Sequence, residues 1–438
     1  MQTFLRIWLG QIISVVGTYI TDFALGVWAY QTTGSLTLFA LILVLTYLPN
    51  LLISPFAGVL VDRWNRRWVM LVADSVTGVT AIAMMMLVST GNLEIWHIYL
   101  GVSISSVSNA FHIPAYISAI AQVVPKQHLG RANGMVQISR AMARILGPTI
   151  AGFLIEAVQL QGVLLFDFAT YVLATIALLS VRIPDPEPVE QRDRKTVNLD
   201  RIWDEISSGW DYVAARPGLL GLMIFFGVTY LTEGMIQVLF WPIILNFASS
   251  SDLGIVLSIS GCGMLFGSLF VSAWGGLKRQ VHGILFFVSL QGLCLCLGGF
   301  QPTLFLAAIG GFGYLFSQPI IVSSNQTIWQ CKVPTYLQGR VFALQGLLEK
   351  SLLVITQLSV GPLVDRFFEP MMMPGGFLAE TIGQVIGSGP GRGSALLLCG
   401  VGILNITAAL IAYRTPRLRR VETEVPDAIA PTANVVSS

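Results

Sequence analysis

The stretch QVHGILFFVSLQGLCLCLGGFQPTLFLAAIGGFGYLFSQPIIVSSNQTIWQC, residues Gln280–Cys331, contains no Asp, Glu, Lys or Arg in 52 residues. A helix needs about 20 apolar residues to cross a bilayer. The sequence GGFQP at Gly298–Pro302 interrupts the run, which therefore predicts two membrane-spanning helices and a tight turn. Backbone groups in lipid must be satisfied within their own segment, so we expect helices here.

The composition of the whole chain supports a membrane protein. Of 438 residues, 54% are hydrophobic and 11% are charged, whereas soluble proteins carry about 25% charged residues. A soluble fold of this size cannot hide so much apolar surface, but a bilayer can. The formal net charge of +2 gives no signal for nucleic acid. We expect a multi-pass protein of the plasma (inner) membrane.

Apolar segments elsewhere raise the predicted number of spans to twelve. Apart from the two above, they are Ile7–Tyr30, Leu38–Val61, Trp68–Val88, Ile95–Val123, Arg131–Ala157, Gly162–Val181, Pro217–Phe247, Leu253–Leu277, Val341–Phe367 and Gly393–Tyr413. With this count, 20 of the 25 basic residues fall on the side of the termini, and only Arg366 and Arg392 lie in the opposite loops. The positive-inside rule then places both termini in the cytoplasm.

The spans divide the chain into two bundles of six. We expect an N-terminal bundle over 1–181, a cytoplasmic linker over 182–216, a C-terminal bundle over 217–413 and a disordered cytoplasmic tail over 414–438. The linker begins with the extended segment Pro184–Pro188 and continues after Asn198 with apolar residues at helical spacing. This spacing predicts an amphipathic helix on the membrane surface.

An internal repeat relates the two bundles. VPKQHLGR at Val124–Arg131 and VPTYLQGR at Val333–Arg340 are similar, and they are 209 residues apart. The repeat predicts an all-α fold of two parallel six-helix halves, which can rock against each other around a central site.

The sequence GVLVDRWNRR at Gly58–Arg67 connects two predicted spans. Gly58 permits close approach of a neighbouring helix, and Asp62 can face the positive N-terminal end of a helix. The arginines of this loop can pair with carboxylates and with anionic lipid headgroups; they are Arg63, Arg66 and Arg67.

This loop resembles the signature loop of the major facilitator superfamily. The resemblance implies that the loop latches the inner gate in the outward-open state, with Asp62 against the span Val341–Phe367. Asn65 stands where the family usually has Gly, and Asn tolerates a positive φ better than most residues.

The sequence GPTIAG at Gly147–Gly152 resembles the Gly-Pro motif of the exporter branches of that superfamily, usually drug/proton antiporters. We expect a hinge at Gly147, Pro148 and Gly152, since Pro bends helices and small residues allow tight packing. Arg131–Pro148 and Gln338–Lys350 also resemble the macrolide-efflux and siderophore-export group.

Several charged residues lie deep within predicted spans, where ionisable groups are costly and usually face a cavity or a partner. We expect five to line a central cavity and to bind substrate, exchange protons or both: Asp22, Arg140, Arg144, Glu233 and Glu349. The alternative is that they form structural ion pairs. Closer to the ends of spans, we expect solvated or locally paired groups at Asp74, Glu156, Asp167 and Asp365.

The leading functional interpretation is a secondary transporter that exports a drug, macrolide or siderophore-like amphipathic molecule in exchange for protons. An uptake carrier, a lipid or lysolipid carrier, and a membrane receptor or scaffold without transport remain open. An enzyme is not expected, because no catalytic cluster or phosphate-binding loop is present in the sequence. The five cysteines lack metal-binding spacing, so neither metal nor cofactor is expected. The expected partners are a small-molecule substrate, protons and membrane lipid, with the protein as a monomer.

Overall fold

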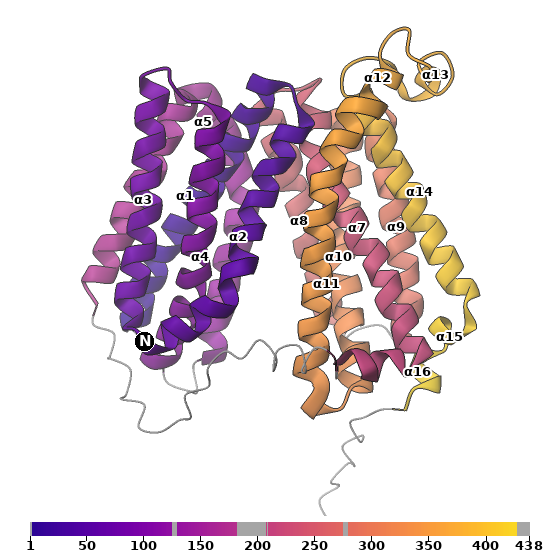
Figure 1. Cartoon of the computed structure of the whole chain (residues 1–438), viewed down its shortest axis with the longest axis horizontal. Coiled ribbons are helices and arrows are strands. Elements are labelled where there is room, and N and C mark those ends of the chain that lie inside the picture. The colour runs from indigo at the N-terminus through magenta and orange to yellow at the C-terminus, as the bar shows by residue number, and fades with distance from the viewer. Residues whose placement is uncertain (1, 125–128, 182–206, 208, 275–278, 427–438) are drawn as a thin grey trace, which may run out of the picture.

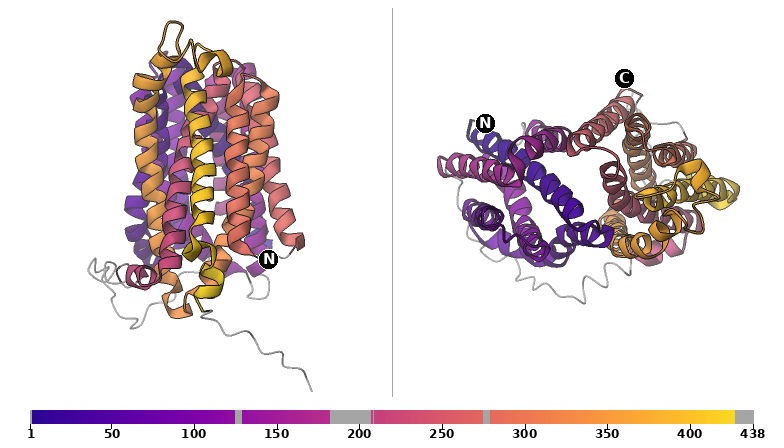
Figure 2. Two further views of the ribbon diagram at one scale, coloured as in Figure 1. Left: turned by 90° about the vertical axis from the view of Figure 1, so that its right-hand side faces the viewer. Right: turned by 90° about the horizontal axis from the view of Figure 1, so that it is seen from above.

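The computed structural model describes residues 2–124, 129–181, 207, 209–274 and 279–426. In these ranges the chain forms two helical bundles side by side (Figures 1 and 2). The first contains α1 (Gln2–Thr33), α2 (Leu36–Arg63), α3 (Arg66–Ser89), α4 (Ile95–Val123) and α5 (Leu129–Leu179). The second contains α7 (Pro217–Leu245), α8 (Ser250–Trp274), α9 (Gln280–Phe300), α10 (Leu304–Lys332), α11 (Thr335–Leu363) and α14 (Arg392–Arg414).

Short helices mark the two ends of the bundles. The π-helix η2 (Val364–Phe368) extends α11 and leads to α12 (Glu369–Met372) and α13 (Gly383–Ile386) at one end, which we call the top. The N-terminus, α15 (Pro416–Arg419) and α16 (Val421–Glu424) lie at the opposite end, which we call the base (Figure 1).

Ten helices among the described residues are long and apolar enough to cross a membrane. Large apolar side chains on their outward faces are exposed, as at Val79, Ile224 and Ile411. Lipid is the natural solvent for such faces, so the protein is a multi-pass integral membrane protein.

Two predicted spans, Arg131–Ala157 and Gly162–Val181, correspond to two helical arms that share the label α5 and meet at Gln159. Only Gln159 leaves the helical backbone, with φ 57°. Ala132 and Leu178 nevertheless belong to the same apolar cluster at the base. The chain therefore rises to the top, reverses at Gln159 and returns to the base.

The tail was expected to be disordered over 414–438, and for residues 415–426 this expectation is wrong. Leu418, Val421 and Val425 are buried against the base of the second bundle. The Glu422 carboxylate accepts hydrogen bonds from the backbone N–H of Gln280 and Val281, at 2.9 and 3.2 Å, and so caps α9. The three buried apolar side chains and this cap hold residues 415–426 in an ordered position against the bundle. Residues 427–438, and the predicted surface helix up to residue 206, lie outside the described residues.

The apolar cores show how the two bundles meet. At the base each bundle has its own core, around Phe4 and Met70 in the first and around Leu219 and Trp329 in the second. Towards the top the cores are shared. There α2 packs on α11, and α5 packs on α8. The described residues thus form a structure that is closed at the top, with separate cores at the base.

Candidate functional site

A polar cavity of about 460 Å³ opens within the second bundle, between α7, α9, α10 and α11. Both predicted acidic residues of this bundle, Glu233 and Glu349, line it. The other polar lining residues include five carboxamides: Gln291, Gln318, Asn325, Gln326 and Gln345. The apolar part of the lining is largely aromatic and contains Phe226, Tyr230, Tyr314 and Phe342. Such a wall can hold an amphipathic molecule that carries positive charge.

The structure also brings charges of the first bundle towards this cavity. Asp22 of α1 and Arg144 of α5 have exposed side chains, although they lie in the middle of membrane-spanning helices. Tyr47 of α2 lies within electrostatic range of Asp22, Arg144 and Glu233, and Glu233 lies within range of Glu349. Glu233 and Glu349 thus line the cavity itself, while the place of Asp22 and Arg144 in a central cavity stays a prediction. The side chain of the fifth predicted residue, Arg140, lies outside the described part of the structure.

Aromatic rings close this space at the top. Trp241 of α7 stands against two rings of the first bundle, with centroid distances of 5.0 Å to Phe23 and 5.8 Å to Phe39. Gly26 gives the indole room, since a Cβ there would lie 3.1 Å from the ring. The contact buries apolar surface from both bundles and separates the cavity from the top.

Asp365 forms a second closure, which we call the top latch. From η2 its carboxylate accepts hydrogen bonds from the Leu36 and Thr37 N–H groups, at 3.1 and 2.9 Å. It also accepts from the hydroxyls of Ser35 and Thr37, at 2.9 and 2.7 Å. The first N–H groups of a helix have no partner within it, and they attract anions. A residue of the second bundle thus caps α2 of the first.

The predicted Gly-Pro motif lies at the contact between α5 and α8. The Thr149 hydroxyl contacts the Ser258 hydroxyl and donates to the Gly254 carbonyl at 3.2 Å. A Cβ at Gly152 would stand 2.6 Å from the Ser250 carbonyl oxygen. At Pro148 the backbone remains helical. The motif thus permits close packing here, while its role as a hinge stays a prediction.

The predicted inner-gate loop lies at the base and fastens α3. Asn65 does not use the positive φ that Asn tolerates, since its φ is −63°. Its side chain instead accepts from the Arg67 N–H at 2.9 Å and caps α3, and an N-cap requires an extended backbone. Arg67 donates to the last carbonyls of α5, at 3.2 Å to Leu178 and 2.7 Å to Leu179.

The other residues of that loop are only partly described. Arg66 is buried and donates to the Trp64 carbonyl at 3.4 Å. The side chains of Gly58, Asp62 and Arg63 lie outside the described set, so the expected contact of Asp62 with the helix that starts at Thr335 stays a prediction.

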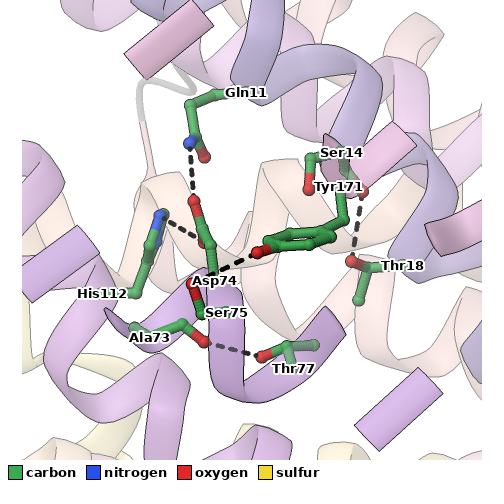
Figure 3. A network of polar contacts seen from close by, with 9 residues as sticks. All are labelled: Gln11, Ser14, Thr18, Ala73, Asp74, Ser75, Thr77, His112 and Tyr171. Atoms are coloured by element: carbon green, nitrogen blue, oxygen red, sulfur yellow. Dashed lines mark hydrogen bonds and ion pairs between the residues drawn. The ribbon is translucent and has the colours of Figure 1, made fainter. Parts of the chain in front are cut away.

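Sequence reasoning missed two arrangements. Asp365 was expected to be solvated or locally paired, but it joins the two bundles. Asp74 was placed in the same group, yet it is largely buried and pairs with His112 of α4 at 3.2 Å (Figure 3). A histidine and an acid on separate helices have no characteristic spacing in the sequence, so the sequence alone gave no sign of this pair. For Asp365 a signal did exist, because GPLVDR at Gly361–Arg366 matches GVLVDR at Gly58–Arg63 in five of six residues.

Comparison with known proteins identifies the group to which this arrangement belongs. Residues 7–352 match a sequence model described as the Major Facilitator Superfamily. The chain is 27% identical over 352 residues to Macrolide efflux protein A of Streptococcus pyogenes, covering 78% of this chain and 84% of that protein. It is 25% identical over 344 residues to the lysophospholipid transporter LplT of Photorhabdus laumondii subsp. laumondii, covering 76% and 81%.

Solved structures agree in fold. A bacterial homologue of the lysosomal transporter Spinster, in an inward-facing and unoccupied conformation, has a TM-score of 0.66 at 13% identity and covers 96% of this chain and 97% of that one. The POT family transporter PepTSo has a TM-score of 0.68 at 10% identity and covers 97% and 99%.

Proposed function

This chain belongs to the Major Facilitator Superfamily, and from that membership we propose that it is a secondary active transporter that exports an amphipathic small molecule in exchange for protons. The observation that carries the proposal is the acidic, aromatic-lined cavity beside an interface that, among the described residues, is closed at the top and has separate apolar cores at the base. The direction is supported by the relatives named for macrolide efflux and by the partial Gly-Pro motif on α5.

We further propose twelve membrane-spanning segments with both termini in the cytoplasm. The count takes α4 and the two arms of α5, before and after Gln159, as separate spans. Basic residues concentrate at the end that carries the termini, which supports the orientation. The base then faces the cytoplasm, and the structure represents the inward-facing state of a carrier that works by alternating access.

The substrate class follows from the lining of the cavity. Glu233 and Glu349 lie on one wall with four aromatic rings. Two carboxylates that share a partly dehydrated space repel each other, and a cation between them relieves that repulsion. We therefore propose a substrate with a basic amine on an apolar body, as in a macrolide.

Arg144 supports a second candidate. Its exposed guanidinium faces the same central space, and an arginine there can bind a phosphate group bidentately. A lysophospholipid carrier would use this residue. The two candidates differ in which charge is essential, Glu233 for an amine and Arg144 for a phosphate.

Transport assays on cells that lack or contain the protein test the proposal. Radiolabelled erythromycin and a labelled lysophospholipid are offered separately, each with and without a protonophore. Export predicts lower accumulation of erythromycin when the protein is present, and loss of that difference with the protonophore. Higher accumulation would mean uptake, and the same accumulation of both probes in the two cell types would contradict transport of either class.

A further inference from the structure

Asp74 and His112 lie in contact inside the first bundle, away from the proposed substrate cavity, and they form an ion pair when the histidine is protonated. The Asp74 Oδ1 atom lies 3.2 Å from His112 Nε2, and each side chain is 14% exposed. Gln11 of α1 donates to the other carboxylate oxygen at 3.3 Å. Figure 3 shows the three side chains converging from α1, α3 and α4. The partners of this carboxylate are thus an amide and an imidazole.

The groups around the pair come from every helix packed on α3. From α5, Tyr171 donates to the hydroxyl of Ser75, the neighbour of Asp74, at 3.2 Å. From α4, the ring of Tyr116 stacks on His112 with centroids 6.1 Å apart. Asp167 of α5 is the other buried acid of this bundle, and it lies against Gly17 of α1.

Such a pair is a poor device for stability alone. Taking two charges out of water costs more than their attraction returns unless further bonds satisfy them. Inside a membrane, ionisable residues therefore usually serve ion or proton movement. Histidine is the side chain whose charge ordinarily changes between pH 5 and 8. One proton can be taken up by a carboxylate oxygen of Asp74 or by a ring nitrogen of His112. Its release restores the original pair, and no other bond needs to break.

A polar face of α1 leads away from the pair along the helix. Gln11, Ser14, Thr18 and Thr21 are three or four residues apart, so they share one helix face. At 1.5 Å per residue this face extends over about 15 Å. Gln11 contacts Asp74 at one end, and Thr21, at the other end, directly precedes Asp22 in the sequence.

We propose that Asp74 and His112 together hold the proton that drives transport, and that the proton reaches the central cavity along this face of α1. The proposal rests on the proposed function. In this proposal the proton and the substrate bind at separate sites. The proton binds in the first bundle, and the substrate binds in the acidic cavity of the second. Rocking of the bundles about α2, α5, α8 and α11 then couples them.

Purified protein in proteoliposomes tests this assignment, with labelled erythromycin as the probe. Two assays are run on each variant: uptake driven by an imposed pH gradient, and counterflow between equal pH. Asp74→Asn and His112→Gln should reduce gradient-driven uptake by about tenfold or more and leave counterflow within about twofold of wild type, a difference of ~1.4 kcal/mol or more. Tyr171→Phe removes a hydrogen bond of the same network without a histidine or a carboxylate, and it should leave both assays unchanged.

The outcomes separate the two proposals. Wild-type protein that shows neither activity would overturn the proposed function for this probe. Wild-type transport with full gradient-driven uptake by Asp74→Asn would overturn only the proton site. If Asp74→Asn does not fold, infrared difference spectra of His112→Gln and wild type decide: a pH-dependent carboxyl band that is the same in both would contradict the pair.

A second inference comes from the top latch and from the repeated hexapeptide. GVLVDR ends α2 at the base, and GPLVDR, at Gly361–Arg366, ends α11 at the top. The two helices pack against each other in opposite directions. The second copy supplies Asp365, which caps the start of α2.

We infer that Asp365 stabilises the state in which the top is closed. In that state it holds the N-terminus of α2, and this contact must break before the top can open. The π-helix at Val364–Phe368 sets the position of Asp365, and such segments are frequent at functional sites.

Cysteine labelling tests this inference. A Tyr47→Cys reporter, in a background without the five native cysteines, is labelled with a membrane-impermeant maleimide from either side of oriented vesicles. Asp365→Asn should raise labelling from the top side at least about threefold and lower it from the base, a change of ~0.7 kcal/mol. Thr37→Val, which removes one of the four bonds, should act weakly in the direction of Asp365→Asn.

Asp252→Asn is the matched control. Asp252 lies near the top and accepts from the Ser249 N–H and hydroxyl, at 3.1 and 2.9 Å, but it caps α8 within its own bundle. It should leave the reporter unchanged. An equal shift in Asp252→Asn, or no shift in Asp365→Asn and Thr37→Val, would overturn the inference.

Discussion

At the scale of single residues, Glu233 is the one on which we propose that substrate recognition depends most. It lines the cavity of the second bundle and lies within electrostatic range of both Arg144 and Glu349. A carboxylate in such a partly dehydrated space binds a cation more strongly than the same group does in water. Its neighbour Glu349 shares the wall, so the two acids act together.

Replacing Glu233 with Gln should weaken binding of a cationic probe while keeping the side-chain shape. We expect the KM for erythromycin to rise about tenfold, equivalent to ~1.4 kcal/mol, with little change for a neutral lysophospholipid analogue. Transport assays over a range of probe concentrations measure the effect. Gln326→Glu, which adds an acid to the same wall, is the matched control and should not raise that KM; a rise in both variants would argue against recognition by charge.

At the scale of helix pairs, Gly152 allows α5 to pack closely on α8. A Cβ there would stand 2.6 Å from the backbone oxygen of Ser250, and backbone cannot move aside as a flexible side chain can. Small residues at helix contacts in membranes allow this close approach.

Gly152→Ala should therefore destabilise the protein by about 1–3 kcal/mol, the usual range for overpacking, and slow transport. Gly400→Ala is the control, since a Cβ at Gly400 in α14 would meet nothing within 4 Å. That change should be neutral or slightly stabilising, because Ala favours helices. Thermal unfolding in detergent gives both results, and equal unfolding temperatures for the two variants would contradict the packing argument.

The C-terminal segment, residues 415–426, caps α9 and packs against the base of the second bundle. Glu422 satisfies the backbone N–H groups of Gln280 and Val281. Lys332 holds the segment from the other side, with Nζ donating to the carbonyls of Glu422 and Val425. Loss of a helix cap typically costs about 1 kcal/mol.

Glu422→Gln should accordingly lower the stability of the second bundle by about 1 kcal/mol. Glu424→Gln changes an exposed acid of the same short helix and should have no effect. Limited proteolysis after residue 414 and thermal unfolding together measure the loss. Equal behaviour of the two variants would mean that the segment is held by apolar contacts alone.

At the scale of the whole molecule, the interface between the bundles must open at the top for transport. Thr149 and Ser258 face each other across α5 and α8 with their hydroxyls in contact. Cysteines at these positions have the separation that a disulfide needs. A disulfide between them would therefore link the two bundles and leave Asp365 of the top latch in place.

Oxidised Thr149→Cys/Ser258→Cys, in a background without native cysteines, should abolish erythromycin transport, and reduction should restore it. Asn50→Cys/Ser106→Cys joins α2 to α4 inside the first bundle, where Asn50 N–H donates to the Ser106 hydroxyl at 3.1 Å, and oxidation there should leave transport intact. Full transport by the oxidised first pair would exclude rocking about this interface.

The sequence by itself determined the membrane class and the family. Both depend on local patterns, since the length of apolar runs, the charge of loops and short motifs need no knowledge of what lies across the fold. The sequence also predicts that Asp22, Arg144, Glu233 and Glu349 line a central cavity, because a charge deep in an apolar span has few places to face other than a cavity.

Only the tertiary structure decided which polar groups meet. Asp74 and His112 are 38 residues apart on different helices, and Asp365 is more than 300 residues from the helix that it caps. Spacing along the chain does not encode such contacts, because they depend on how helices pack and on which faces turn inward. The same holds for the closed top, where shared apolar cores join the bundles, and for the base, where each bundle keeps a core of its own.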